Sequence, residues 1–404
     1  MAVRRTVVSR TRLNEQRTKN NERRTKMITF NKPYFTGKET TYIEQAVKNM
    51  HISGDGEFTK KCHAFFEEKY GFKKCLLTTS CTDALEMAAI LINIQPGDEV
   101  IIPSYTFVST ANAFVLRGAK IVFVDSMLNH PNMDVTKIEE LITSKTKAIV
   151  PVHYAGVACD MDPIMELAEK HKLFVIEDAA QAIDSYYKGR PLGGIGHLAA
   201  FSFHETKNII SGEGGMLVIN DEQFEKRAEI IREKGTNRSQ FFRGEVDKYG
   251  WVDMGSSFLP SDMIAAFLYA QLENLEAIQK KRKQIWGWYK SELQVLQKER
   301  HLKLPEIPSN ATNNAHMFFV VVEDEKTRDQ LLKFLKQNQV HAVFHYLSLH
   351  ESPFYQGKHD GRKLEHCNNF TNTLIRLPFF YELKQNQVKT ICQYIKSFFD
   401  DRKN

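Results

Sequence analysis

The sequence contains no long apolar run and few cysteines. No stretch of the 404 residues approaches the roughly 18 to 20 consecutive apolar residues that span a bilayer, so we expect no membrane-spanning helix. The six cysteines are dispersed and include no CxxC pair, which fits neither a zinc site nor a small disulfide framework. We therefore expect reduced thiols, a cytoplasmic location and no bound metal.

The net positive charge of the chain lies in one terminal segment. Residues 1–26 hold nine Lys/Arg and two Glu, so the remaining 378 residues carry a net charge near −1. A near-neutral body argues against nucleic-acid binding, which needs a basic surface. Segment 1–26 is predicted to be disordered, and it lacks the apolar core of a signal peptide. Its composition partly resembles that of a transit peptide. However, the sequence from Met27 looks like the start of a protein, so we favour the interpretation that residues 1–26 are translated upstream sequence and not native protein.

Strand-like and helix-like stretches alternate along the rest of the chain. Between residues 74 and 178, short continuous apolar runs read as strands, and the amphipathic stretches between them read as helices. This pattern is typical of a mostly parallel sheet with helices on both faces. We predict an α/β fold with a large domain over 27–260, one long connecting helix over 261–298, and a small C-terminal α/β domain over 299–404.

Polar and aromatic residues follow four of the predicted strands. The carboxyl ends of parallel strands share one rim of the sheet, where open α/β sheets bind ligands. The side chains predicted to meet at this rim are Thr82, Phe107, His153, Tyr154 and Asp178. The helix that begins near Cys81 also offers hydroxyls and free amides to an anion such as phosphate, although simple N-capping has the same geometry.

One lysine lies in a turn between two apolar strands. Lys207 could form a Schiff base with an aldehyde, provided that burial or a nearby cation lowers the pKa of its amine. Asp178 could keep a pyridinium nitrogen protonated, so that a pyridoxal ring acts as an electron sink. Taken singly, Lys207 reads as a solvated turn residue and Asp178 as a helix N-cap. Together they indicate a cofactor site.

Three motifs in this region resemble a known family. The runs VIEDAAQ at 175–181, SFHETKN at 202–208 and GEGG at 212–215 are similar to those of the sugar-nucleotide aminotransferases, which are pyridoxal 5′-phosphate (PLP) enzymes of fold type I. The resemblance extends from Met27 to the C-terminus. It implies a homodimer, with its site at the subunit interface, that moves the amino group of L-glutamate to the 4-keto carbon of a dTDP-linked 6-deoxyhexose. Another nucleotide-linked keto sugar, or a regulatory relative that only binds PLP, remains open.

The resemblance also implies roles for individual residues. Lys207 would bond to the cofactor and shuttle the proton, Asp178 would pair with the pyridine nitrogen, and Gln181 would contact the ring hydroxyl. Phe107 would stack on the ring, and the phosphate would be bound by Cys81, Thr82 and Ser202. Contacts with the substrate are expected from Tyr154, His345, Tyr346 and Gly54, the last in a glycine turn where backbone can approach a ligand.

One position departs from the family pattern. Many relatives place an asparagine of the partner subunit on the cofactor phosphate, just before the long helix. Leu259 occupies that position here, in the run Ser256-Ser257-Phe258-Leu259. Either Ser256 or Ser257 takes over the contact, or the phosphate is held within one subunit.

Overall fold

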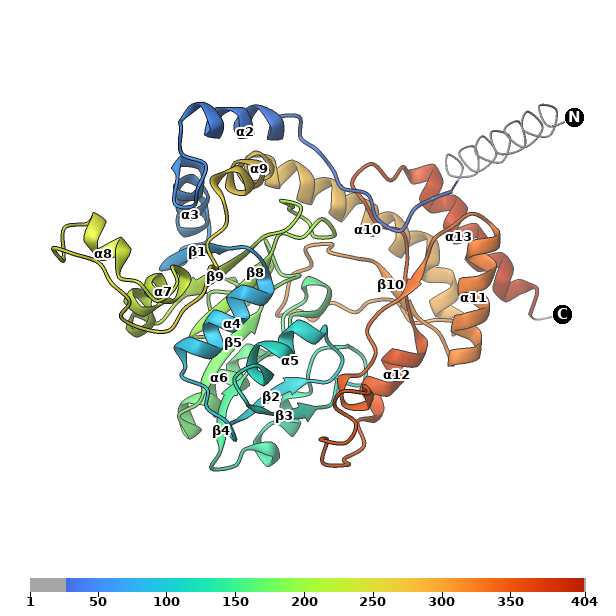
Figure 1. The fold of residues 1–404 in the computed structure, drawn as a ribbon. Helices are drawn as coiled ribbons and strands as arrows, with labels where there is room; N and C mark the ends of the chain where they lie inside the picture. Colours follow the sequence, from blue (N-terminus) through green and yellow to red (C-terminus); the bar gives the residue numbers. More distant parts are fainter. Residues whose placement is uncertain (1–26, 403–404) are drawn as a thin grey trace, which may run out of the picture.

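A mixed seven-stranded sheet forms the centre of the protein (Figure 1). The computed structural model describes residues 27–402, so the predicted disorder of the tail lies outside the described residues. The order in the sheet is β1-β9-β8-β5-β4-β2-β3, and β9 alone runs antiparallel to its neighbours. The strands are β1 (Lys74–Thr78), β2 (Glu99–Pro103), β3 (Lys120–Val124), β4 (Thr146–Ile149), β5 (Phe174–Asp178), β8 (Leu198–Ser202) and β9 (Gly215–Ile219). The predicted mostly parallel α/β sheet is confirmed.

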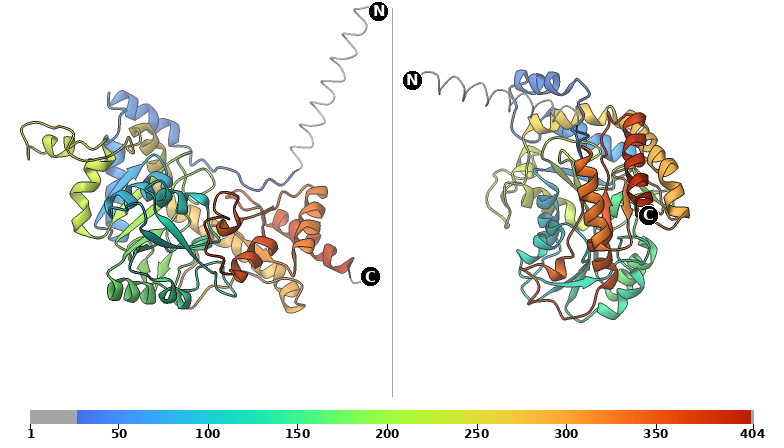
Figure 2. Two further views of the ribbon diagram at one scale, coloured as in Figure 1. Left: turned by 60° about the horizontal axis from the view of Figure 1, so that its bottom comes forward. Right: turned by 90° about the vertical axis from the view of Figure 1, so that its right-hand side faces the viewer.

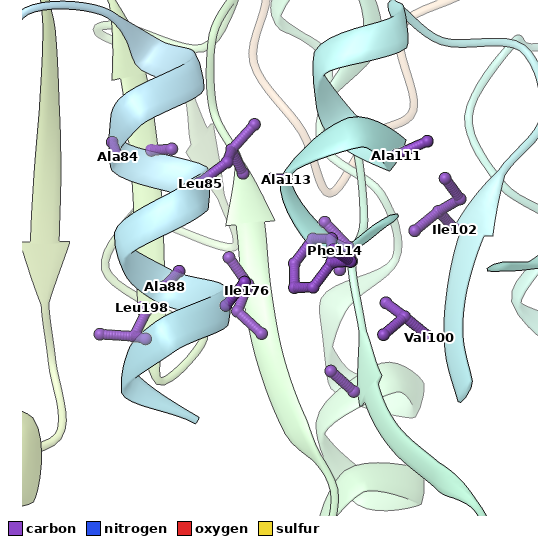
Figure 3. Close-up of a cluster of buried hydrophobic side chains, with 14 of the residues drawn as sticks. Ala84, Leu85, Ala88, Val100, Ile102, Ala111, Ala113, Phe114, Ile176 and Leu198 are labelled. Atoms are coloured by element: carbon purple, nitrogen blue, oxygen red, sulfur yellow. The ribbon is translucent and has the colours of Figure 1, made fainter. Parts of the chain in front are cut away.

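Both faces of this sheet are covered by helices. In β2, the buried side chains of Val100 and Ile102 join one apolar cluster, whereas Ile101 joins another on the opposite face. Figure 3 shows Val100, Ile102 and Ile176 facing helices α4 and α5. The first face packs against α4 (Cys81–Leu91), α5 (Val108–Val115) and α7 (Glu225–Arg232), and the second against α3 (Glu57–Tyr70), α6 (Met161–His171) and α9 (Asp262–Leu272). This double coverage explains why the strands are apolar throughout.

The connection predicted as one helix over 261–298 is two helices. After α9, α10 runs over Leu275–Lys298, and the break falls at Glu273 and Asn274. The Asn274 side chain donates a hydrogen bond of 3.0 Å to the Ala270 carbonyl, so it satisfies an acceptor at the end of α9. Asparagine competes with backbone hydrogen bonding in this way and disfavours helix interiors.

The C-terminal part forms a second layer with its own apolar core. A three-stranded antiparallel sheet, in the order β10-β12-β11, packs with α10 and two further long helices around this core. Figure 2 shows α10, α11 and α13 side by side. The elements are β10 (Phe319–Val321), α11 (Glu325–Gln337), β11 (Val343–Phe344), α12 (Glu365–Thr373), β12 (Leu374–Arg376) and α13 (Gln385–Asp400).

The start of the described chain lies against this C-terminal part rather than the large sheet. Ile28 forms a parallel bridge with Val340, and the Phe379 amide donates to the Phe30 carbonyl at 2.9 Å. The chain then reaches the large domain through α2 (Glu39–Lys48). Smaller elements are β6 (Tyr186–Tyr187), β7 (Arg190–Pro191) and α8 (Arg238–Phe242). Between residues 27 and 402, no helix has the length and apolar character needed to cross a bilayer.

Candidate active site

A cavity of about 570 Å³ opens beyond the carboxyl ends of the central strands, where the sequence places a ligand site. Its walls come from the ends of β5 and β8, the start of α4, the loop before α5 and the C-terminal domain. Nine residues predicted for the site line it: Cys81, Thr82, Phe107, Asp178, Gln181, Ser202, Lys207, His345 and Tyr346. In particular, Lys207 and Asp178 border the same cavity.

Three predicted residues do not line the cavity. His153 is fully buried, and its Nε2 lies 2.9 Å from Glu177 Oε2. Tyr154 is buried behind the wall, where its hydroxyl and His345 Nδ1 are 2.6 Å apart. Gly54 packs against the Leu259 side chain and the Pro260 carbonyl, and a Cβ there would come within 2.2 Å of Leu259. Gly54 is therefore needed for close packing before α9, and it does not reach the cavity of its own chain. The sequence indicated a close approach to the backbone at Gly54, but the group that approaches is another segment of the same chain and not a ligand.

Lys207 is held by a short, ordered turn. It lies between β8 and β9, which pair from Ser202 opposite Gly215, and its amide donates to the His204 carbonyl at 2.9 Å. Its Nζ has no hydrogen bond or ion pair with any described residue, and burial lowers the pKa of the amine. The negative charge of Asp178 opposes this lowering. A lysine with a depressed pKa is more often neutral, which is the nucleophilic form.

Asp178 ends β5, and two donors fix its carboxylate. The Thr110 hydroxyl donates to Oδ2 at 2.7 Å, and the Ala180 amide donates to Oδ1 at 3.1 Å. Asp178 and Thr110 are both buried. The Thr110 contact comes from α5, across the cavity floor, so the carboxylate orientation is set by tertiary structure. A side chain that served only as a helix N-cap would not need the hydrogen bond from Thr110.

The start of α4 forms the opposite end of the cavity. Ser80 caps the helix by accepting from the Asp83 amide at 3.1 Å, which leaves Cys81 and Thr82 in the first turn. The first amides of a helix lack intrahelical acceptors and attract anions. Gly215 packs so closely here that a Cβ would lie 2.3 Å from the Cys81 nitrogen. Burial raises the pKa of the Cys81 thiol, so this residue offers an S–H and not a thiolate.

Aromatic side chains form another wall of the cavity. The Phe107 side chain is 55% exposed, and its ring centroid lies 6.2 Å from that of Tyr346. The rings of His345 and Tyr346 stack at 3.6 Å. Gln181 ties this wall to the floor, since its Nε2 donates to the Tyr346 hydroxyl at 2.9 Å and its Oε1 accepts from the Ala155 amide at 2.6 Å.

Two cavity residues from the C-terminal domain were not predicted from the sequence. His316 Nδ1 lies 2.8 Å from Asn208 Oδ1. Because the Asn208 amide donates to Gln279 and to the Asn314 carbonyl, its oxygen is left as an acceptor, and His316 Nδ1 must carry the proton. The second is Arg376, the last residue of β12. The available signal for Arg376 was a charged residue within the apolar run Leu374 to Leu377.

Comparison with known proteins identifies the family. A family model described as the DegT/DnrJ/EryC1/StrS aminotransferase family matches residues 33–396. The chain belongs to this family. One relative is the GDP-perosamine synthase of Caulobacter vibrioides, which is 34% identical over 80% of this chain and 85% of that protein. Another is the spore coat polysaccharide biosynthesis protein SpsC of Bacillus subtilis, 33% identical over 84% and 88% respectively. The solved aminotransferase TlmJ from Streptoalloteichus hindustanus matches with a TM-score of 0.86 and 26% identity, covering 94% of this chain and 100% of that one.

The family resemblance, the fold class and the PLP cofactor expected from the sequence are thus confirmed. DegT/DnrJ/EryC1/StrS aminotransferases depend on PLP, so the chain is a PLP-dependent aminotransferase. The cavity fits this cofactor on its own chemistry. It presents an unpaired amine to an aldehyde, a fixed carboxylate to a ring nitrogen, and a helix N-terminus to a phosphate. Among the described residues, no group of three or more His, Cys, Asp or Glu is arranged to hold a metal ion.

Proposed function

We propose that this enzyme transfers the amino group of L-glutamate to the 4-keto carbon of dTDP-4-keto-6-deoxy-D-glucose. The products are dTDP-4-amino-4,6-dideoxy-D-galactose and 2-oxoglutarate. The observation that supports the transamination is the Lys207 amine, which has no hydrogen-bond or ion-pair partner among the described residues and borders the same cavity as the supported Asp178 carboxylate. The sugar rests on the sequence: SCTDALEMAA at 80–89, VPVHYAGVACDMD at 150–162 and AEIIREKGTNRSQFFRG at 228–244 resemble the transaminase that makes this amino sugar for enterobacterial common antigen.

The roles proposed for the cavity residues rest on the family resemblance, and their positions in the cavity are compatible with it. Asp178, held by Thr110, would pair with the cofactor nitrogen, and Gln181 would contact the ring hydroxyl. Phe107 would stack on the ring. The phosphate would be bound by the free amides at the start of α4 and by the side chains of Cys81, Thr82 and Ser202.

The chemistry divides between the cofactor and the chain. When bound, PLP supplies an electron sink that stabilises negative charge on the substrate carbon. Lys207 Nζ would take the proton from the α-carbon of the donor and return it to the cofactor carbon C4′; in the second half-reaction it would move a proton from that carbon to C4 of the sugar. Burial lowers the pKa of this amine, so it is more often unprotonated, as a base in this position requires. His345 and Tyr346 are positioned to contact the substrate.

A second candidate keeps the chemistry and changes the sugar. Relatives 31% to 34% identical carry the name GDP-perosamine synthase, which favours a GDP-linked substrate as the alternative. The test gives the PLP-loaded enzyme L-glutamate with either the dTDP-linked or the GDP-linked 4-keto-6-deoxy sugar. We expect 2-oxoglutarate beyond the one equivalent per site released by the glutamate half-reaction only with the dTDP sugar. We also expect a product whose NMR couplings show an axial amine at C4. Turnover with the GDP sugar alone, or an equatorial amine, would overturn the proposed substrate or product.

The proposed functional unit is a homodimer. The segment around α8 projects from the body (Figure 1), and it exposes large apolar side chains, with Phe242 70% and Trp251 84% accessible. Such a patch is unusual on a monomer. Light scattering during size exclusion should give twice the chain mass, and Trp251→Glu should reduce both that mass and the activity. A fully active monomer would contradict the proposal.

A further inference from the structure

Arg376 is a cation that forms no ion pair with any residue that the structure describes. Its Nε is buried and has no hydrogen-bond partner, and its guanidinium makes no hydrogen bond or ion pair with any residue between 27 and 402. Its guanidinium lies over the ring of Phe30, with the guanidinium carbon 4.7 Å from the ring centre. Burying a charge without a counter-charge is costly, so such a group is expected to meet an anion that belongs to a ligand.

The position of Arg376 decides which anion this is. It lines the same cavity as Lys207, close enough for its charge to lower the pKa of the lysine amine further. The phosphate site proposed at α4 belongs to the large domain, whereas Arg376 enters from β12 of the C-terminal domain beside His345 and Tyr346. The histidines of this wall do not compete for the anion as cations, because burial lowers the pKa values of His316 and His345.

We propose that Arg376 binds the α-carboxylate of the amino donor. This rests on the proposed transamination and adds to it the residue that recognises the amino acid. In an α-amino acid, the carboxylate is attached to the same carbon as the reacting nitrogen, so it must lie next to Lys207. The keto sugar has no anion there, since its phosphates lie on the far side of the ring. A guanidinium fork matches a carboxylate with two parallel hydrogen bonds.

The two half-reactions can be measured apart. Enzyme loaded with PLP is mixed with L-glutamate, and separately enzyme loaded with pyridoxamine phosphate is mixed with dTDP-4-keto-6-deoxy-D-glucose, while the cofactor absorbance is followed. For Arg376→Met we expect kcat/KM for glutamate to fall about 30- to 3,000-fold, the loss typical of removing one partner of a buried charge pair. The sugar half-reaction should stay within about threefold of the wild type. An equal loss in both, or none with glutamate, would overturn the assignment.

A second amino donor tests how much the α-carboxylate contributes to recognition. 4-Aminobutyrate is glutamate without this group and keeps the amine and the distal carboxylate. The wild-type preference for glutamate should be large and should collapse in Arg376→Met. A preserved preference would show that Arg376 acts on another group. Arg376→Lys keeps the charge without the forked donor geometry, so its preference for glutamate should lie between those of the wild type and Arg376→Met.

The controls separate the possible failures. Arg328→Met removes an arginine of the same domain that pairs with Glu325 and Asp329 outside the cavity, and it should leave both half-reactions unchanged. Loss of an unpaired cation should not lower the melting temperature of Arg376→Met, so unfolding of this variant would assign Arg376 a structural role. If wild-type enzyme reacts with neither glutamate nor the sugar, the proposed function fails, whatever the variants do.

Discussion

The support that Thr110 gives to Asp178 allows a quantitative prediction. Thr110→Val keeps the shape of a fully buried side chain and removes the hydroxyl that donates to Asp178 Oδ2 at 2.7 Å. Without cofactor, the freed carboxylate can turn toward water in the cavity. In the proposed PLP complex it would have to face the ring nitrogen, and one oxygen would then be left unsatisfied. The cost therefore falls mainly on the bound state.

The expected size follows from the bond that is lost. A hydrogen bond to a charged group contributes about 1.5–3 kcal/mol, and 1.4 kcal/mol is a factor of ten. Titration of apoenzyme with PLP, followed by absorbance, should give a Kd about 10- to 100-fold higher in Thr110→Val than in the wild type. The glutamate half-reaction should slow as well, because the ring nitrogen is less well paired.

A matched variant distinguishes orientation from stability. Thr59 donates to Asp262 Oδ1 at 2.8 Å, and both residues are buried outside the cavity. Thr59→Val removes the same kind of bond and should lower the melting temperature without changing the affinity for PLP. If both variants lose PLP affinity equally, or if Thr110→Val binds PLP as tightly as wild type, the orienting role of Thr110 is refuted.

Three further predictions concern the pKa of Lys207, its role in catalysis, and the contribution of Glu177 to stability. The rate at which apoenzyme captures PLP should rise with pH, because the neutral Lys207 amine reacts, and its midpoint in stopped-flow absorbance should lie below the ordinary lysine pKa of about 10.4; a midpoint at or above that value contradicts the depressed pKa. Lys207→Ala should abolish both half-reactions while circular dichroism shows a folded protein, and retained turnover would remove Lys207 from its role. Glu177 is fully buried and accepts from His153 and the amides of Gly193 and Gly196, and despite the opposing effect of burial these bonds lower its pKa. Stability from Glu177 is therefore present above its unfolded pKa of about 4.3 and is lost as pH falls through the folded pKa. Glu177→Gln should cost about 3–5 kcal/mol in urea unfolding at pH 7 and flatten the acid side of the stability profile, and an unchanged profile would refute this.

Much of the lining of the candidate cavity could be predicted from the sequence. Asp178 and Phe107 follow apolar strands directly, so the parallel-sheet rule brings them to one rim, and the turn carrying Lys207 adjoins it. Arg376 and His316 were missed because their place in the site depends on how the C-terminal domain packs against the large one. No local pattern encodes this packing.

Two differences have local physical causes. The single helix expected over 261–298 is broken because the Asn274 side chain takes up a backbone carbonyl, an effect that hydrophobic periodicity does not register. Gly54 was read as a place where backbone meets a ligand, but Leu259 fills that space within the same chain. Leu259 is also the position where the resemblance leads us to expect an asparagine. Its side chain packs against Gly54 within the same chain, so our proposal takes the donors to the cofactor phosphate from the start of α4.

Lys207 and Arg376 together indicate how stability and function are balanced in this enzyme. They come from different domains and border one cavity, and neither forms an ion pair with residues 27–402. Two basic groups held in one sheltered cavity without an ion pair destabilise the fold when both are charged, so packing alone does not explain their presence. Their charges become useful only when ligands enter. Lys207→Met and Arg376→Met apoenzymes should therefore melt at or above the wild-type temperature, as expected of sites where function opposes stability. If both variants melt well below wild type, the two cations are structural, and the ligand-centred account of the cavity fails.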